Sequence, residues 1–184
     1  MTTKAGLAVI DALSTGREAT PEELATETGY SRAHLYEVLD ELLTAGFLAE
    51  SRGPSNQRRV HVTEHPVTEA YRTLKSEFSH MDWTELLSPA TLRVCWYLDT
   101  PRRVADIARR LKITRQGVHS ALSPLKHRAI LSRSDPGYAL REEFSPLLEF
   151  ARTIVNHEHR SQTREIAPSA TIAWCDPRRA LVRI

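Results

Sequence analysis

The sequence predicts a mainly α-helical fold with small β-hairpins, in which one short unit occurs twice in tandem. In residues 104–131, apolar residues recur at helical spacing on both sides of a break, which indicates two short helices joined by a tight turn. Residues 24–48 align with residues 107–131 without a gap at an offset of 83 positions, so that Ser31 aligns with Thr114. Chance would not place a helix cap, a turn and the apolar positions together twice, so we infer an internal repeat.

The first unit begins with three predicted helices. The apolar residues of positions 7–13 share one face of the first helix. Residues 20–23 have the pattern of a capping box with proline at the first helical position, which starts the second helix, and Gly29 takes the turn after it. The third helix starts at Ser31 and stops at Gly46, where we expect a left-handed cap.

A β-hairpin is expected next. Residues 47–50 and 58–63 read as two strands around a turn at residues 52–57. Three helices followed by a hairpin is the order of a winged helix, in which the hairpin is the wing. The basic residues of this wing are Arg52, Arg58 and Arg59.

A further helix opens at Pro66, with an apolar stripe over residues 67–78. This helix could pack on its own unit, link the two units or pair with a second chain. The second unit then starts with a short helix near residues 83–87, or directly at Ser88-Pro89. It continues through the helix pair of residues 104–131 to a shorter wing at residues 131–140, which carries Arg133.

The last part of the chain adds a long helix from Ser145 with an apolar stripe over residues 144–155. Two strands are predicted at residues 171–175 and 180–184; such a hairpin is marginal alone, so it docks on another sheet or begins a further domain. The predicted domains are a first winged helix at 1–65, a linker helix at 66–82, a second winged helix at 83–141, a C-terminal helix at 142–165 and this β-hairpin at 166–184.

Charge is divided unevenly along the chain, although the net charge is only +2. Residues 17–63 carry 5 Lys/Arg against 8 Asp/Glu, whereas residues 84–141 carry 11 against 4. The first unit is therefore acidic and the second is basic. A basic module of this kind is typical of a protein that binds a polyanion.

Several other classes of protein find no support in the sequence. There is no apolar run long enough to span a membrane, and the N-terminus lacks a signal-peptide core, so we expect no membrane partner. Two distant cysteines, Cys95 and Cys175, favour the reducing cytoplasm. His157 and His159 would point to different helix faces, so we expect no metal and no cofactor. No phosphate-binding glycine loop, zinc-protease motif or serine elbow indicates an enzyme.

The pattern L-A-x-x-x-G-x-S-R-x-x-L-x-x-x-L-x-x-L-x-x-x-G-F-L of residues 24–48, with its weaker copy at residues 107–125, resembles the winged helix-turn-helix transcription regulators of bacteria and archaea, the broad MarR/ArsR-type group. The resemblance covers residues 5–63 and 88–141. It implies that double-stranded DNA is the partner, with the third helix of a unit in the major groove and the wing on the backbone or in the minor groove. The groove-facing positions would be Arg32, Ala33, His34, Tyr36 and Glu37 in the first unit, and Arg115, Gln116, Gly117, His119 and Ser120 in the second.

The second unit offers the stronger DNA-binding chemistry. Arg115 can bond guanine O6 and N7, and Gln116 can bond adenine. The cations expected on phosphates, where they add affinity without sequence choice, are Arg109, Arg110, Lys126, His127, Arg128 and Arg133. Two departures from the pattern affect this unit: Pro124 lies inside the third helix, where it removes a backbone hydrogen bond and favours a kink, and Ala129 replaces the glycine of position 46, so a different helix end is expected.

The sequence allows alternative interpretations of the first unit and of the function of the chain. Glu37, Asp40 and Glu41 would repel phosphates, so the first unit is either a second groove reader or a protein-contact or dimer module. The preferred function is a DNA-binding regulator that forms a homodimer through the stripe at 144–155 or the stripe at 67–78, with an unknown effector. The alternatives are a winged-helix protein-interaction scaffold, or the front part of a longer enzyme or antitoxin-like protein.

Overall fold

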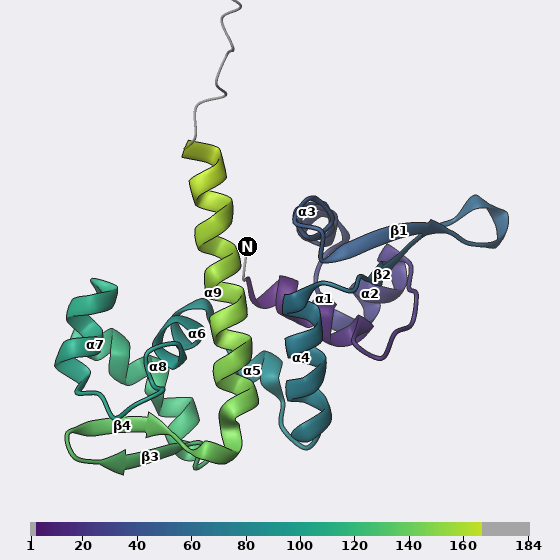
Figure 1. Ribbon diagram of the computed structural model, residues 1–184. Helices are drawn as coiled ribbons and strands as arrows, with labels where there is room; N and C mark the ends of the chain where they lie inside the picture. The colour runs from purple at the N-terminus through teal and green to yellow at the C-terminus, as the bar shows by residue number, and fades with distance from the viewer. Residues whose placement is uncertain (1–2, 167–184) are drawn as a thin grey trace, which may run out of the picture.

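The computed structural model describes the backbone of residues 3–166 and the side chains of residues 3–54 and 56–158 (Figure 1). The predicted C-terminal hairpin and Cys175 lie outside the described residues. The first part of the chain forms α1 (Lys4–Leu13), α2 (Pro21–Thr28), α3 (Arg32–Thr44), β1 (Leu48–Arg52), the short 3-10 helix η1 (Pro54–Asn56) and β2 (Arg58–Val62). The rest forms α4 (Pro66–Glu77), α5 (Trp83–Leu86), α6 (Pro89–Cys95), α7 (Val104–Leu111), α8 (Arg115–His127), β3 (Leu131–Ser134), β4 (Gly137–Leu140), η2 (Glu142–Phe144) and α9 (Ser145–Ile166).

The same order of elements, three helices and an antiparallel hairpin, occurs in both parts. Strand β1 pairs with β2, with Leu48 opposite Val62, and β3 pairs with β4, with Leu131 opposite Leu140. The prediction of a mainly helical chain with small antiparallel hairpins is confirmed, and this architecture fits a winged helix.

One detail of the hairpins follows the offset of 83 residues. Ala19 forms an isolated antiparallel bridge with Val60 of β2, and Arg102 forms one with Tyr138 of β4. Ala19 and Arg102 are 83 positions apart, and each precedes the second helix of its group. In both places the chain therefore pairs at one residue with the second strand of the hairpin before it enters that helix.

The helix starts show the predicted caps. Thr20 Oγ1 accepts from the Glu23 N–H at 3.2 Å, and Glu23 Oε2 accepts from the Thr20 N–H at 2.8 Å, which completes the capping box of α2. Ser31 Oγ caps α3, and Thr114 Oγ1 accepts from the Gly117 N–H at 3.0 Å to cap α8. These hydroxyls satisfy amide groups that have no partner inside the helix.

The prediction that the third helix of the second unit ends differently was wrong. Ala129 has a φ of 55°, in the left-handed region, as does Gly46 with a φ of 76°. The N–H of each donates to a carbonyl three residues back at 3.0 Å, and the N–H of the next residue donates to a carbonyl five residues back. The geometry of the turn overrides the preference of alanine for negative φ. Helix α8 also continues through Pro124 to His127.

This shared turn gives a matched stability prediction. We expect Ala129→Gly to raise the free energy of unfolding by about 0.5–1 kcal/mol, because relief of left-handed strain exceeds the entropy that glycine adds to the unfolded chain. Gly46→Ala should lower it by a similar amount, since no atom lies within 4 Å of the new Cβ and only the backbone resists it. Urea unfolding of both variants measures the two changes in the free energy of unfolding. A lower free energy for Ala129→Gly than for the wild type would contradict the assignment of left-handed strain to Ala129.

Helices α4 and α9 pack against each other within one chain. In Figure 1, α9 runs between the two groups of elements, with α4 beside it. Tyr71 and Phe150 are fully buried with ring centroids 5.3 Å apart, and Phe78 stacks on Phe144 at 4.7 Å. The two apolar stripes expected to form a homodimer are therefore used inside the chain, so that expectation was wrong for these faces.

Hydrogen bonds attach α4 to α1 as well. Tyr71 Oη donates to Asp11 Oδ1 at 2.6 Å, and Lys75 Nζ lies 2.8 Å from the same carboxylate oxygen. Burial and the Asp11 carboxylate raise the pKa of Tyr71 well above its ordinary value, so the hydroxyl remains a donor at neutral pH. One continuous apolar core thus extends from α1 through α4 to α9 and on to α8.

A histidine joins the first group of elements to α9. His65 Nδ1 accepts from the Val67 N–H at 3.1 Å and caps α4. Its ring lies 4.7 Å from that of Phe47 and 5.0 Å from that of His157, measured between centroids. Burial, and then the charge of His157, lower the pKa of His65, so the folded chain favours the neutral imidazole that the cap requires.

This histidine gives a pH prediction. Because the pKa of His65 is lower in the folded chain than the ordinary 6.5, the unfolded chain takes up the proton first as the pH falls. The free energy of unfolding should therefore be smaller at pH 5.5 than at pH 7.5. Urea unfolding of His65→Asn, which keeps a capping oxygen, should show a smaller decrease in the free energy of unfolding from pH 7.5 to pH 5.5 than the wild type shows. A decrease equal to that of the wild type would contradict the role of His65.

Candidate nucleic-acid interface

Helix α8 presents one apolar face to the core and one polar face to solvent. Val118, Leu122 and Leu125 are completely buried. The residues predicted to face a groove lie on the outer side, and those exposed there are Arg115, Gln116, His119 and Ser120. Because the helix carries no acidic residue, its outer face offers only hydrogen-bond donors, neutral groups and positive charge to a ligand.

The cationic side chains around α8 differ in whether they have an ion-pair partner. Among the described side chains, Arg115 and Arg133 have no ion-pair partner, whereas Arg109 lies 3.5 Å from Asp106 with 81% of its side chain exposed. Arg128 lies 3.7 Å from Glu85. Exposed pairs of this kind are weak, so both arginines can exchange a carboxylate for a phosphate.

Lys126 connects α8 to the second hairpin. Its ammonium group lies 4.3 Å from the centre of the Tyr138 ring on β4. A hydrogen bond from Lys126 lowers the pKa of Tyr138. The lysine is exposed, so it brings a positive charge to the surface where the end of α8 meets the wing.

The polar face of α3 in the first unit carries mixed charge. Leu35, Leu39 and Leu42 are buried in the core. The exposed residues are Arg32, Ala33, His34, Tyr36, Glu37, Asp40 and Glu41. His34 lies 3.8 Å from Glu37, and Tyr36 is 38% exposed. This face can donate hydrogen bonds near its N-terminus but becomes negative toward its C-terminus.

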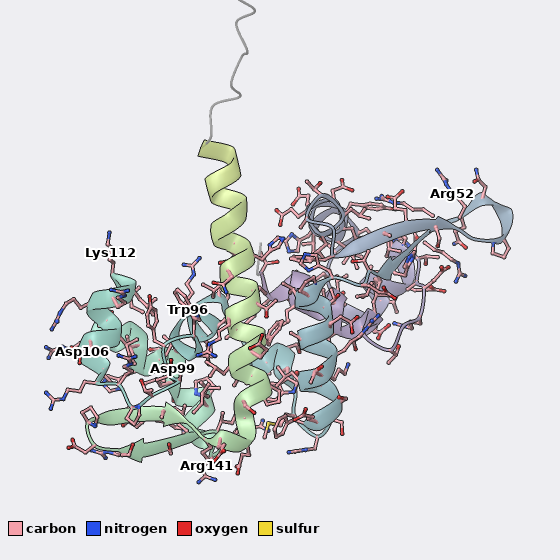
Figure 2. All side chains as sticks on the ribbon, in the orientation of Figure 1. Arg52, Trp96, Asp99, Asp106, Lys112 and Arg141 are labelled. Carbon is pink, nitrogen blue, oxygen red and sulfur yellow. The ribbon has the colours of Figure 1, made fainter. Side chains whose placement is uncertain are left out.

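The three arginines of the first wing have different surroundings. Arg52 lies at the outer end of the hairpin, exposed to solvent (Figure 2), and donates to the Asn56 carbonyl at 3.2 Å. Arg58 is half-buried, and its guanidinium donates to Glu50 at 2.8 Å and to Asp40 at 3.3 Å. The Arg59 side chain lies against the backbone of Gly53, because a Cβ added to Gly53 would approach Arg59 Nε to 2.7 Å. Of the three, Arg52 is the one placed to contact a distant partner.

Arg110 occupies a different environment from its neighbour Arg109. It lines a pocket between α6, α7 and α9 together with Lys112. Lys112 is the left-handed turn residue between α7 and α8, with a φ of 54°, and Figure 2 places it at the exposed end of α7. No motif in the sequence marks Lys112, although its charge and exposure make it a candidate contact.

Two negative findings apply to the described residues. No group of three or more His, Cys, Asp or Glu side chains among them is arranged to hold a metal ion. None of their helices is both long and apolar enough to cross a membrane. Cys95 is fully buried, and burial raises the pKa of its thiol to about 12, so it is unreactive at neutral pH.

The exposed third helix, its hydroxyl cap and the adjoining hairpin have the architecture of a winged helix-turn-helix. Residues 4–52 match the IclR helix-turn-helix domain. This match covers 49 of the 184 residues and spans α1, α2, α3 and β1. It indicates a DNA-binding transcription regulator. No curated protein matches the chain.

Proposed function

We propose that this chain is a tandem winged-helix transcription regulator that binds double-stranded DNA, with α8 as its main groove-reading helix. The observation that supports this most strongly is the outer face of α8, where Arg115 and Gln116 project from the first turn without an acidic neighbour on the helix. A bidentate contact from either residue to a base edge is worth about 1–3 kcal/mol of discrimination. His119 and Ser120 extend the same face by one turn.

The phosphate contacts in this proposal come from both ends of the second unit. Arg109 lies on α7, Lys126 and Arg128 lie at the end of α8, and Arg133 lies on the wing. All four side chains are exposed. They add affinity for any duplex, and Arg110 adds to the positive potential from its pocket.

The first unit is proposed as a second, weaker contact. The IclR-type match falls on this unit, which favours α3 in a groove, with Arg32, His34 and Tyr36 near the bases and Arg52 on the backbone. Its acidic residues reduce its share of the affinity. Two such helices in one chain could read successive major grooves about 34 Å apart. A homodimer would need a surface other than the α4 and α9 stripes, and the site of action would be the cytoplasm.

A salt titration of the full chain on a fluorescent duplex tests this proposal. Five phosphate contacts, four from the second unit and Arg52 from the first wing, predict that the logarithm of the affinity falls linearly with the logarithm of the salt concentration, with a slope of about −4.5. Arg133→Gln should reduce that slope by about 0.9. Affinity that does not change with salt, or no binding at low salt, would reject DNA binding by this surface.

A second candidate function rests on the acidic side of α3. Glu37 and Asp40 have 79% and 70% of their side chains exposed, and such a face could bind a basic protein. In this scaffold reading, the chain purifies without nucleic acid and retains a protein partner in a pull-down, and Glu37→Gln with Glu41→Gln releases that partner. A high absorbance ratio from bound nucleic acid after purification favours the DNA-binding proposal instead.

A further inference from the structure

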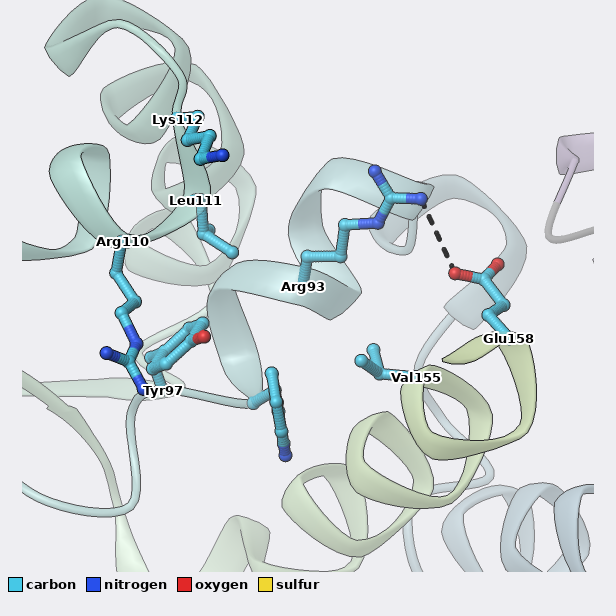
Figure 3. A pocket seen from close by; sticks show the side chains of 8 residues that line it. Arg93, Tyr97, Arg110, Leu111, Lys112, Val155 and Glu158 are labelled. Atoms are coloured by element: carbon cyan, nitrogen blue, oxygen red, sulfur yellow. Dashed lines mark hydrogen bonds and ion pairs between the residues drawn. The ribbon is translucent and has the colours of Figure 1, made fainter. Parts of the chain in front are cut away.

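A pocket of about 300 Å³ lies between α6, α7 and α9, outside the polar face of α8. Figure 3 shows Arg110, Leu111, Lys112 and Tyr97 on one side of it, Val155 and Glu158 on the other, and Arg93 between them. Trp96 completes the lining. Its size is at the lower end for small-molecule sites in proteins.

The charge of the lining is positive. Three cationic side chains, Arg93, Arg110 and Lys112, surround the pocket with one carboxylate, Glu158, which lies 3.4 Å from Arg93. Arg110 and Lys112 have no ion-pair partner among the described side chains. The net lining charge of +2 matches a dianion, and a phosphate monoester carries a charge of about −1.5 to −2 at pH 7.

The pocket also offers flat apolar surface. The rings of Trp96 and Tyr97 lie 4.8 Å apart between centroids at an interplanar angle of 57°, and both side chains are half-exposed. Aromatic side chains in such positions stack well with nucleobases. A second hollow adjoins the pocket at Tyr97 and Arg110, and its lining adds Arg102 and Arg109 together with Asp106, which lies 3.5 Å from Arg109.

We propose that this pocket binds a small phosphorylated compound with a planar ring, of the nucleoside monophosphate class. The ring would lie against Trp96 and Tyr97, the phosphate would accept hydrogen bonds from Arg110 beside Tyr97, and the positive charge of Lys112 would attract it. Such a ligand contacts Leu111 and Lys112, which lead directly into the cap of α8. The site lies outside the polar face of α8, and its test needs no DNA.

Calorimetric titration of the full chain with AMP, GMP, CMP and UMP tests this site, with the four matching nucleosides and inorganic phosphate as fragments. At least one nucleotide should bind about tenfold more tightly than its nucleoside and than phosphate, because each fragment makes only part of the contacts. Arg110→Gln and Lys112→Gln should each weaken that nucleotide about tenfold. Arg133→Gln, which removes the same charge outside the pocket, should leave its affinity unchanged.

Three results would overturn the proposal. None of the four nucleotides binds; inorganic phosphate binds as tightly as the best nucleotide, which would indicate an anion site without ring recognition; or Arg133→Gln weakens binding as much as the pocket variants, which would indicate a general charge effect. Circular dichroism of each variant confirms that a lost affinity does not come from unfolding.

Discussion

Replacing Phe150 with alanine is expected to lower the free energy of unfolding by about 3–5 kcal/mol. Phe150 is 1% exposed and lies on α9 with its ring 5.3 Å from that of Tyr71 on α4. Its removal leaves a cavity between two helices that are already held in place by other contacts, so the packing cannot close fully. Chemical denaturation of the purified variant measures this loss.

The matched control for Phe150 is Tyr36→Ala, which removes an aromatic ring from the exposed side of α3. That side chain is 38% exposed and contributes little to the core, so the expected change is within about 0.5 kcal/mol. If Phe150→Ala cost no more than Tyr36→Ala, α9 would not be an integral part of the fold, and the two apolar stripes would again be free to form a homodimer.

Replacing Arg115 with alanine is expected to weaken binding to a preferred duplex by about 1–3 kcal/mol, because the guanidinium is proposed to contact a guanine edge. Arg32→Ala is the matched control, since Arg32 occupies the equivalent first-turn position of α3, 83 residues earlier. We expect a smaller loss there, because Glu37 and Asp40 on the same helix oppose DNA binding. Fluorescence anisotropy at a fixed salt concentration compares the two.

The opposite order of effects would move the main groove contact to the first unit, where the IclR-type match lies. Equal and negligible effects would favour the scaffold reading for both units. Neither variant should alter stability, because both side chains are exposed.

Local features of the fold could be predicted from the sequence because their causes are local. The hydroxyl caps at Thr20, Ser31 and Thr114 depend on residues within three positions, so each can be identified from the sequence. The left-handed end at Gly46 is equally local. Ala129 was predicted wrongly because residue type suggests a backbone conformation, whereas the surrounding hydrogen bonds impose one.

Long-range pairings could not be predicted. An apolar stripe shows that one face of a helix is buried but does not identify what buries it, so the pairing of α4 with α9 was open to a linker or dimer interpretation. The contacts of Arg58 with Asp40 and Glu50 bring together two strands and a helix, which sequence spacing does not show.

The candidate site also combines features that could be predicted from the sequence with features that could not. The outward positions of α8 follow from helical periodicity, and four of the five expected residues, all except Gly117, are exposed. The pocket at Trp96 and Lys112 depends on how α6, α7 and α9 meet, so no motif marked it.

Selection of bound sequences from a random duplex library, for the wild type and for Arg115→Ala, tests the central claim most directly. If α8 reads bases in the major groove, the wild type will select a defined site, and Arg115→Ala will relax the preference at one base position while the rest of the site persists. Arg133→Ala, a proposed phosphate contact, should weaken binding to all sequences alike. Identical selected sites for the wild type and Arg115→Ala would contradict base reading by this helix.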